Sequence, residues 1–231
     1  MNRAADAAPD TLRLSLDAKA TVKVGPFARG GKSRVPTRAA DHDFGATAQV
    51  TPVGLLLPQT GDLFLYAVQG RVTSDCLVDI LELWWARVGP QWPGVRTLVL
   101  NLDNGPENHS GRTQFMARLV EFAARSGLRI ELTYYPPYHS KYNPVERCWG
   151  VLEQHWNGSL LDTVAAVEGF MSSMTWKGRH PWVERITKTY AKGVRLGRQA
   201  MQAIEARVQR LPGLGKWFVG IPSPVPVSWD L

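Results

Sequence analysis

The sequence predicts an α/β fold in which a mixed sheet is covered by helices on both faces. Short runs of strand-like alternation occur between Thr11 and Val68, helical and strand-like periods then alternate, and helical patterns follow. With 231 residues, 44% of them hydrophobic, the chain can bury a sizeable core. We expect a disordered N-terminus over residues 1–10, a main domain over 11–182, and a C-terminal helical appendage over 183–231, formed by a basic helix and a tail packed on that domain.

The strands of the N-terminal part are indicated by their alternation. Thr11–Asp17 predicts a half-buried strand, and we expect Thr21–Val24 to pair with it. Residues 25–49 are rich in glycine and basic side chains and predict a mobile loop. Val50–Leu57 and Leu63–Val68 flank the turn sequence PQTGD and predict a hairpin.

From Ser74 onward, helical and strand periods alternate. Apolar side chains recur at helical spacing, and we expect Trp84, Trp149 and Trp156 on such stripes to be mainly core residues. The predicted elements are a helix from Ser74 to Gly89, a strand Val95–Leu102, a helix Gly111–Ser126 closed by Gly127, a strand Leu128–Tyr135, a helix opened by Asn143-Pro144, and a long basic helix over 183–211.

The net charge of the chain and the absence of several sequence motifs limit the classes of function that it can have. Lys and Arg total 27 and Asp and Glu 20, a net charge of +7 that favours polyanions such as nucleic acid. No apolar run approaches the roughly 20 residues of a membrane span, and we expect no secretory signal, because no apolar stretch follows Arg3. Two cysteines fit a reducing cytoplasm. The sequence has no P-loop, dinucleotide-binding glycine motif or serine-hydrolase elbow.

Three carboxylates stand where an α/β sheet presents its chemistry. Asp17 and Asp103 follow strand-like runs, and Glu146 lies in the first turn of a predicted helix. Carboxylates on one rim can hold Mg²⁺, and a pair of such ions supports phosphodiester chemistry. Each residue also has a structural interpretation: Asp103 can start an Asx turn, Asn143 and Glu146 can form a capping box, and Asp17 can be a structural acid.

Two blocks and the start of the chain resemble a known family. Asn101–Glu107 (NLDNGPE) and Tyr135–Glu146 (YPPYHSKYNPVE) resemble the second-Asp and final-Glu blocks of DDE transposases of bacterial insertion sequences. The opening SLDAKATVKVGPF, with DHDF after it, is similar to the Rhodopirellula-type transposase DDE domain, and the likeness covers about residues 11–225. The chain departs from typical members after Asp17 and after Asp103.

The resemblance implies an RNase H-like fold and a catalytic triad of Asp17, Asp103 and Glu146 holding two Mg²⁺ or Mn²⁺ ions. The implied activity is that of a DNA transposase, with metal-dependent phosphodiester cleavage and strand transfer of an insertion sequence. Two alternatives remain open: a truncated, catalytically inactive protein that binds DNA as a regulator, and a nuclease of the same fold without strand transfer.

The implied partner is double-stranded DNA, both element ends and target, in the bacterial cytoplasm near the nucleoid and away from membranes. Related transposases carry a helix-turn-helix recognition module; here we expect it to be absent, separate or lost, and a second copy of the chain is a further expected partner. The residues expected to contact DNA are polar or basic, namely Lys19, Arg29, Lys32, Arg34, His139, Lys141, Asn143, Lys188, Lys192 and Arg195.

Overall fold

The computed structural model describes residues 2–33, 35–42, 45–136 and 142–223. The chain forms two compact units. The first unit contains Met1–Ser15, Thr73–Ser140 and Ala191–Leu231, and the second contains Leu16–Val72 and Lys141–Tyr190. No helix among the described residues combines the length and the hydropathy that crossing a membrane requires.

The first unit is built on parallel strands extended by an antiparallel edge. Strand β1 pairs in parallel with β5, β5 pairs in parallel with β6, and β9 and β8 follow in antiparallel order. The strands are β1 (Thr11–Ala18, which continues into the second unit), β5 (Thr97–Leu102), β6 (Arg129–Tyr134), β8 (Gln209–Arg210) and β9 (Phe218–Ile221).

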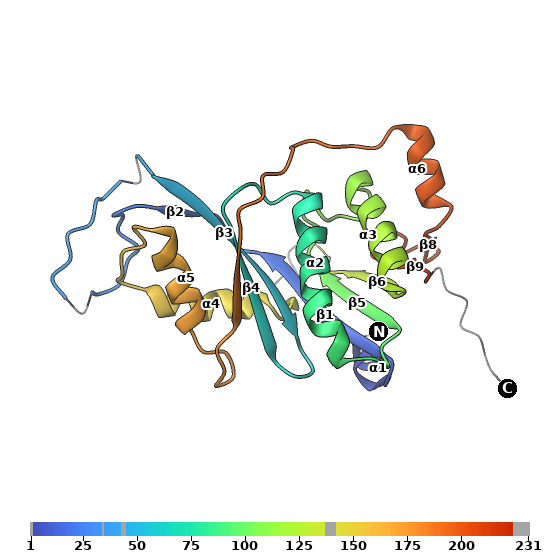
Figure 1. Ribbon diagram of the computed structural model, residues 1–231, viewed down its shortest axis with the longest axis horizontal. Helices are drawn as coiled ribbons and strands as arrows, with labels where there is room; N and C mark the ends of the chain where they lie inside the picture. The colour runs from blue at the N-terminus through green and yellow to red at the C-terminus, as the bar shows by residue number, and fades with distance from the viewer. Residues whose placement is uncertain (1, 34, 43–44, 137–141, 224–231) are drawn as a thin grey trace. The chain divides into compact units, whose positions relative to one another are not determined.

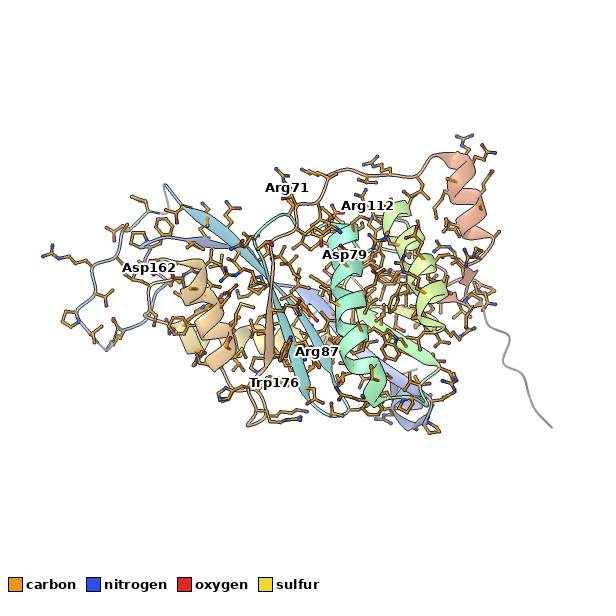
Figure 2. The ribbon with its side chains drawn as sticks, in the orientation of Figure 1. Arg71, Asp79, Arg87, Arg112, Asp162 and Trp176 are labelled. Carbon is orange, nitrogen blue, oxygen red and sulfur yellow. The ribbon has the colours of Figure 1, made fainter. Side chains whose placement is uncertain are left out.

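Two long helices of the first unit lie side by side, as Figure 1 shows: α2 (Ser74–Val88) and α3 (Thr113–Ser126). Gly127 ends α3 as predicted, in the left-handed region with φ of 72°, and the Thr73 side chain caps α2 by accepting from the Cys76 N–H. Arg118 of α3 pairs with Asp75 and Asp79 of α2 at 2.8 and 2.7 Å; Asp79 is labelled in Figure 2. The short elements are η1 (Gly89–Gln91), α1 (Asn2–Ala7) and α6 (Arg198–Glu205).

The second unit contains the predicted hairpin and two helices. Strands β3 and β4 pair antiparallel from Thr51 and Val68 to Leu57 and Asp62, and β7 adds to β4 in parallel. The elements are β2 (Val22–Val24), β3 (Ala48–Leu57), β4 (Asp62–Val68), α4 (Glu146–Trp156), α5 (Val164–Ser173) and β7 (Trp182–Ile186).

Helix α4 packs directly on β3. Its side chains Val145, Cys148, Trp149, Leu152 and Trp156 belong to the apolar core of this unit. The helix approaches β3 at a glycine: a Cβ on Gly54 would lie 2.6 Å from the Trp149 ring and 2.9 Å from Val145. This close approach fixes α4 against the strand.

Three expectations differ from the structure. Residues 1–10, expected to be disordered, contain α1, and Asp6 of this helix pairs with the buried Arg13 at 2.7 Å. Strand β2 pairs with β3 and not with β1. The segment that leaves β1 stays bonded to β3, because the Lys19 N–H donates to the Pro52 carbonyl, and β2 then continues beside β3.

The predicted C-terminal helical appendage is wrong. Residues 183–211 do not form one helix: β7 occupies their start, and the eight-residue α6 is the only helix among them. Pairing of β7 with β4 overrides the helical spacing, and Gly193, with φ of 75°, turns the chain before α6. Lys188, Lys192 and Arg195 therefore lie on a segment without regular structure, not on a helical stripe.

Candidate active site

Asp103 follows β5 and opens a loop that folds back over its carboxylate. The Asn108 side-chain amide donates to Asp103 Oδ1 at 2.7 Å. A Cβ on Gly105 would lie 3.1–3.2 Å from both Asp103 oxygens, so glycine leaves room beside the carboxylate. Within the described residues, Asp103 Oδ2 has no hydrogen-bond partner. One oxygen is therefore held, and the other is available.

The Asp103 loop (residues 103–110) is anchored by the first unit around it. The Tyr134 hydroxyl donates to the Asn108 carbonyl at 2.7 Å, and burial, assisted by the Asp103 charge, raises the pKa of Tyr134 and keeps it a donor. Arg210 donates to the Ser110 carbonyl at 2.9 Å. Glu107 accepts from Arg112, which Figure 2 labels, at 3.1 Å. The loop is thus rigidly positioned.

Asp17, near the end of β1, is buried with 9% of its surface exposed. Its Oδ2 accepts a hydrogen bond of 2.7 Å from the indole Nε1 of Trp149 on α4. The residue before it is bound to the same helix entry, because the Asn143 amide donates to the Leu16 carbonyl at 3.0 Å. Two bonds therefore tie the end of β1 to α4.

Glu146 stands between these two anchors. It follows Asn143 by three residues and precedes Trp149 by three, and residues at this spacing are neighbours on a helical surface. Its backbone N–H is bonded to the Asn143 carbonyl at 3.0 Å, and its carboxylate has no partner within the described residues. The carboxylate does not reach back to Asn143, so the capping-box alternative is wrong.

The three acids are divided between the units: Asp103 belongs to the first, and Asp17 and Glu146 belong to the second. Among the described residues, no group of three or more His, Cys, Asp or Glu side chains forms a metal site. That the three acids meet remains a prediction.

The donors around Asp103 nevertheless fit a hard divalent cation. They are oxygens, including Asp103 Oδ2 and the Asn108 Oδ1 atom, which is buried without a hydrogen-bond partner in the described part of the chain. A Cβ on Gly105 would crowd both atoms, at 3.1 Å from each.

Two of the expected DNA contacts are engaged inside the second unit. Lys19 pairs with Glu153 and lies 5.7 Å from the centre of the Trp156 ring. Arg29 lies 5.9 Å from the same ring and donates to the Lys23 carbonyl at 2.8 Å. Burial lowers the pKa of Arg29, although Glu153 opposes this effect.

The remaining expected contacts fall into three groups. Asn143 is buried and bonded to Leu16. Arg34, His139 and Lys141 lie outside the described residues. Lys32, Lys188, Lys192 and Arg195 are exposed, and Lys188 lies 5.1 Å from the Tyr190 ring.

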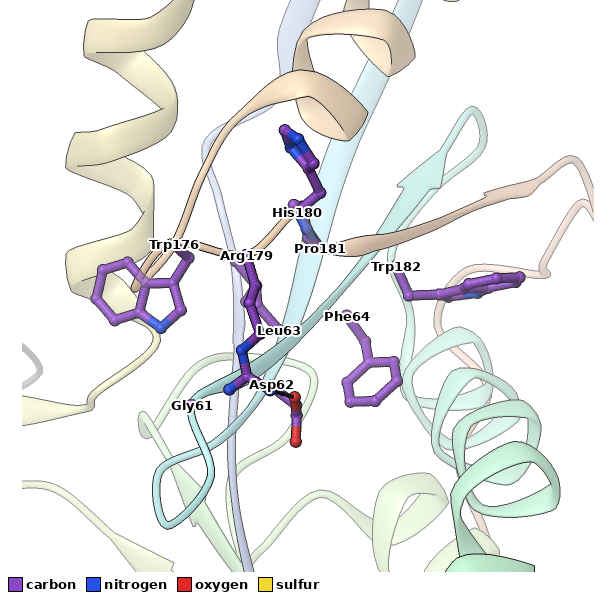
Figure 3. A pocket seen from close by; sticks show the side chains of 9 residues that line it. All are labelled: Gly61, Asp62, Leu63, Phe64, Trp176, Arg179, His180, Pro181 and Trp182. Atoms are coloured by element: carbon purple, nitrogen blue, oxygen red, sulfur yellow. Dashed lines mark hydrogen bonds and ion pairs between the residues drawn. The ribbon is translucent and has the colours of Figure 1, made fainter.

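A separate recess of about 270 Å³ lies in the second unit, shown in Figure 3. Phe64, Trp176 and Trp182 are among its lining residues. The two charged side chains that line it, Arg179 and Asp62, pair with each other at 2.6 Å. None of the site residues predicted from sequence lines this recess.

Comparison with known families identifies the chain. The model described as "Rhodopirellula transposase DDE domain" matches residues 1–223. The chain belongs to this family of DDE transposase domains. Comparison with curated proteins gives no match.

A solved structure supports the fold of this transposase domain. The chain is similar to the "Mos1 transposase paired-end complex with left transposon end", with a TM-score of 0.50 and 12% identity. The match covers 68% of this chain and 46% of that one, so the chain spans less than half of the Mos1 structure. The likeness supports an RNase H-like fold, a mixed α/β sheet flanked by helices.

Sequence reasoning missed Asn108 and the polar role of Trp149. Asn108 is hidden in a turn-forming sequence, and its only signal is its position five residues after Asp103. Trp149 was expected to be core, and it is; its bond to Asp17 joins residues 132 positions apart.

Proposed function

We propose that the chain is the catalytic domain of a DNA transposase that cleaves phosphodiester bonds and transfers strands of an insertion sequence. Asp17, Asp103 and Glu146 are the proposed catalytic residues. The observation that carries the proposal is the β1–β5 register, whose last pair in the first unit is Ser15 with Asn101. Asp17, near the end of β1, and Asp103, directly after β5, each come two residues after this pair, as expected of acids on one rim.

Two of the three acids have one carboxylate oxygen held in place by a hydrogen bond. Trp149 fixes one oxygen of Asp17, Asn108 fixes one oxygen of Asp103, and Glu146 lies on the turn between two anchored residues. Fixed carboxylates do not need to reorganise when they act, which lowers the cost of stabilising charge in the transition state.

Two Mg²⁺ or Mn²⁺ ions, when bound, supply a polarised water or 3′-hydroxyl nucleophile and stabilise the leaving oxygen. Asp17, Asp103 and Glu146 would hold them. The exposed Lys32, Lys188, Lys192 and Arg195 would bind DNA phosphates without regard to sequence. The partner is double-stranded DNA, with target and element ends brought together by a second copy or by a separate recognition module.

The test is an end-cleavage and strand-joining assay on donor DNA with Mg²⁺, comparing the wild type with Asp103→Asn and Glu146→Gln. We expect both variants to lose at least about 100-fold in rate, because a metal ligand contributes several kcal/mol to transition-state stabilisation. Full metal-dependent activity of both variants would refute the assignment. Nicks without joined products identify a nuclease, and salt-sensitive DNA binding without cleavage identifies a regulator.

A further inference from the structure

Asn108 is the side chain most closely tied to the Asp103 carboxylate. Its amide nitrogen donates to Asp103 Oδ1 at 2.7 Å, and a carboxylate offers no donor, so this contact fixes which end of the amide faces Asp103. The other end, Oδ1, is buried and has no hydrogen-bond partner in the described residues. A buried acceptor left without a donor is costly unless a ligand or water satisfies it.

The position of Asn108 is set by the fold and not by its own side chain. Its carbonyl accepts from the buried Tyr134 hydroxyl at 2.7 Å, and its N–H faces the Gly105 carbonyl at 3.4 Å. The residue is 5% exposed. The loop therefore delivers a nearly immobile amide to Asp103.

Gly105 completes the arrangement. A Cβ at this position would lie 3.1 Å from Asn108 Oδ1 and 3.1 Å from Asp103 Oδ2. The two unpartnered oxygens therefore both face the position where a side chain of residue 105 would begin, and glycine keeps that position free of side-chain atoms. Two oxygens around one space are the donor chemistry that a hydrated Mg²⁺ or Mn²⁺ ion uses.

We propose that Asn108 is a positioning residue for the metal-binding carboxylate: its amide nitrogen holds Asp103 Oδ1, so that Oδ2 is presented to a divalent cation, and its Oδ1 accepts from a water of that cation. The inference rests on the proposed function, since it takes Asp103 to be a metal ligand. Mutation of a residue that hydrogen-bonds to a metal ligand typically changes metal affinity 10- to 100-fold.

The test measures Mn²⁺ affinity of the full chain by electron paramagnetic resonance, without DNA. We expect Asn108→Ala to weaken Mn²⁺ binding about 10-fold. Asn104→Ala is the matched control, because Asn104 lies on the same loop, is exposed and has no partner among the described residues. It should leave the affinity unchanged. Unchanged affinity in Asn108→Ala would overturn the proposal.

A double-mutant cycle separates positioning from a general structural effect. In an Asp103→Asn background, Asn108→Ala should cause no further loss, because the carboxylate that it orients is gone. An undiminished 10-fold loss in that background would contradict the proposal. If Asn108→Ala does not fold, Asn108→Ser, which keeps a small polar group too short to reach Asp103, replaces it with the same expectations.

The Asp103→Asn variant shows whether a failure concerns the proposed function or only the role proposed for Asn108. If Asp103→Asn binds Mn²⁺ as well as the wild type, the metal assignment of the proposed function fails. If Asp103→Asn loses affinity while Asn108→Ala does not, only the role of Asn108 fails.

Discussion

Asp17 lies near the end of β1 and Asp103 directly follows β5, two strands that pair in parallel, yet the surroundings of the two acids differ. Asp17 is buried and accepts from an indole on a helix that packs in the core of the second unit. Asp103 is partly exposed and accepts from an amide on a loop anchored by Tyr134, Arg210 and Arg112. The first acid therefore depends on the packing of a helix, and the second on a network of loop hydrogen bonds. Changes to packing should affect Asp17 first, and polar changes should affect Asp103 first.

The largest expected effect on stability comes from filling the contact between α4 and β3. Gly54→Ala places a methyl group 2.6 Å from the Trp149 ring, which is closer than van der Waals contact allows. It should lower the free energy of unfolding by about 1–3 kcal/mol. Gly150→Ala is the control on the same helix: a Cβ there meets nothing within 4 Å, and it should stabilise by about 0.5–1 kcal/mol. Urea unfolding measures both, and equal effects would contradict the packing described for α4.

Removing the indole donor to Asp17 should have an effect of comparable size. Trp149→Phe keeps most of the ring but deletes the Nε1–H bond, and should cost about 1.5–3 kcal/mol, the range for hydrogen bonds to charged groups. Trp176→Phe, in the same unit, is the control for a partly buried indole whose Nε1 has no partner among the described residues. If both substitutions lower the free energy of unfolding equally, in thermal or urea unfolding, the Trp149–Asp17 hydrogen bond does not contribute to stability.

Loss of the Tyr134 hydroxyl should have a smaller effect on the first unit. Tyr134→Phe removes the donor to the Asn108 carbonyl and should cost about 0.5–1.5 kcal/mol in urea unfolding. The same substitution should loosen the Asp103 loop, which hydrogen exchange of the amides at 105–110 would record as lower protection. Unaltered exchange would show that the loop does not depend on this anchor.

The smallest effect concerns pH. Burial raises the pKa of Glu153, but bonds from Lys19 and Trp156 outweigh it and leave the pKa below the ordinary 4.5. A carboxyl group whose pKa is lower in the folded state than in the unfolded state stabilises the fold at pH values above its unfolded-state pKa. This contribution of Glu153 is lost as the pH falls below about 4.5. Glu153→Gln should therefore unfold with a shallower loss of stability between pH 5 and pH 3, measured by urea titration; an identical pH dependence would contradict the predicted contribution of Glu153.

Much of the fold could be predicted from local patterns. The end of α3 at Gly127, the β3–β4 hairpin and the end of a strand directly before Asp103 are encoded by nearby residues, and the structure confirms them. The pairing of β7 with β4 could not be predicted, because its partner lies more than a hundred residues earlier and the helical spacing of residues 183–211 favoured another structure. Long-range pairing decides such cases.

The residues of the candidate site also differ in whether the local sequence reveals them. The three acids were visible as residues that follow strands or open a helix, which are local signals. Asn108 and Trp149 act on them through contacts that only the fold creates. The side chains that position the acids were therefore hidden in the sequence, while the acids were not.

The most direct test of the central claim is a Mn²⁺-affinity cycle on Asp17→Asn, Asp103→Asn and the double variant. If acids of the two units hold the same ions, each single variant loses affinity, and the double variant loses much less than the product of the two losses. Independent, fully multiplicative losses would show that Asp17 and Asp103 do not share a metal centre, and would contradict the account.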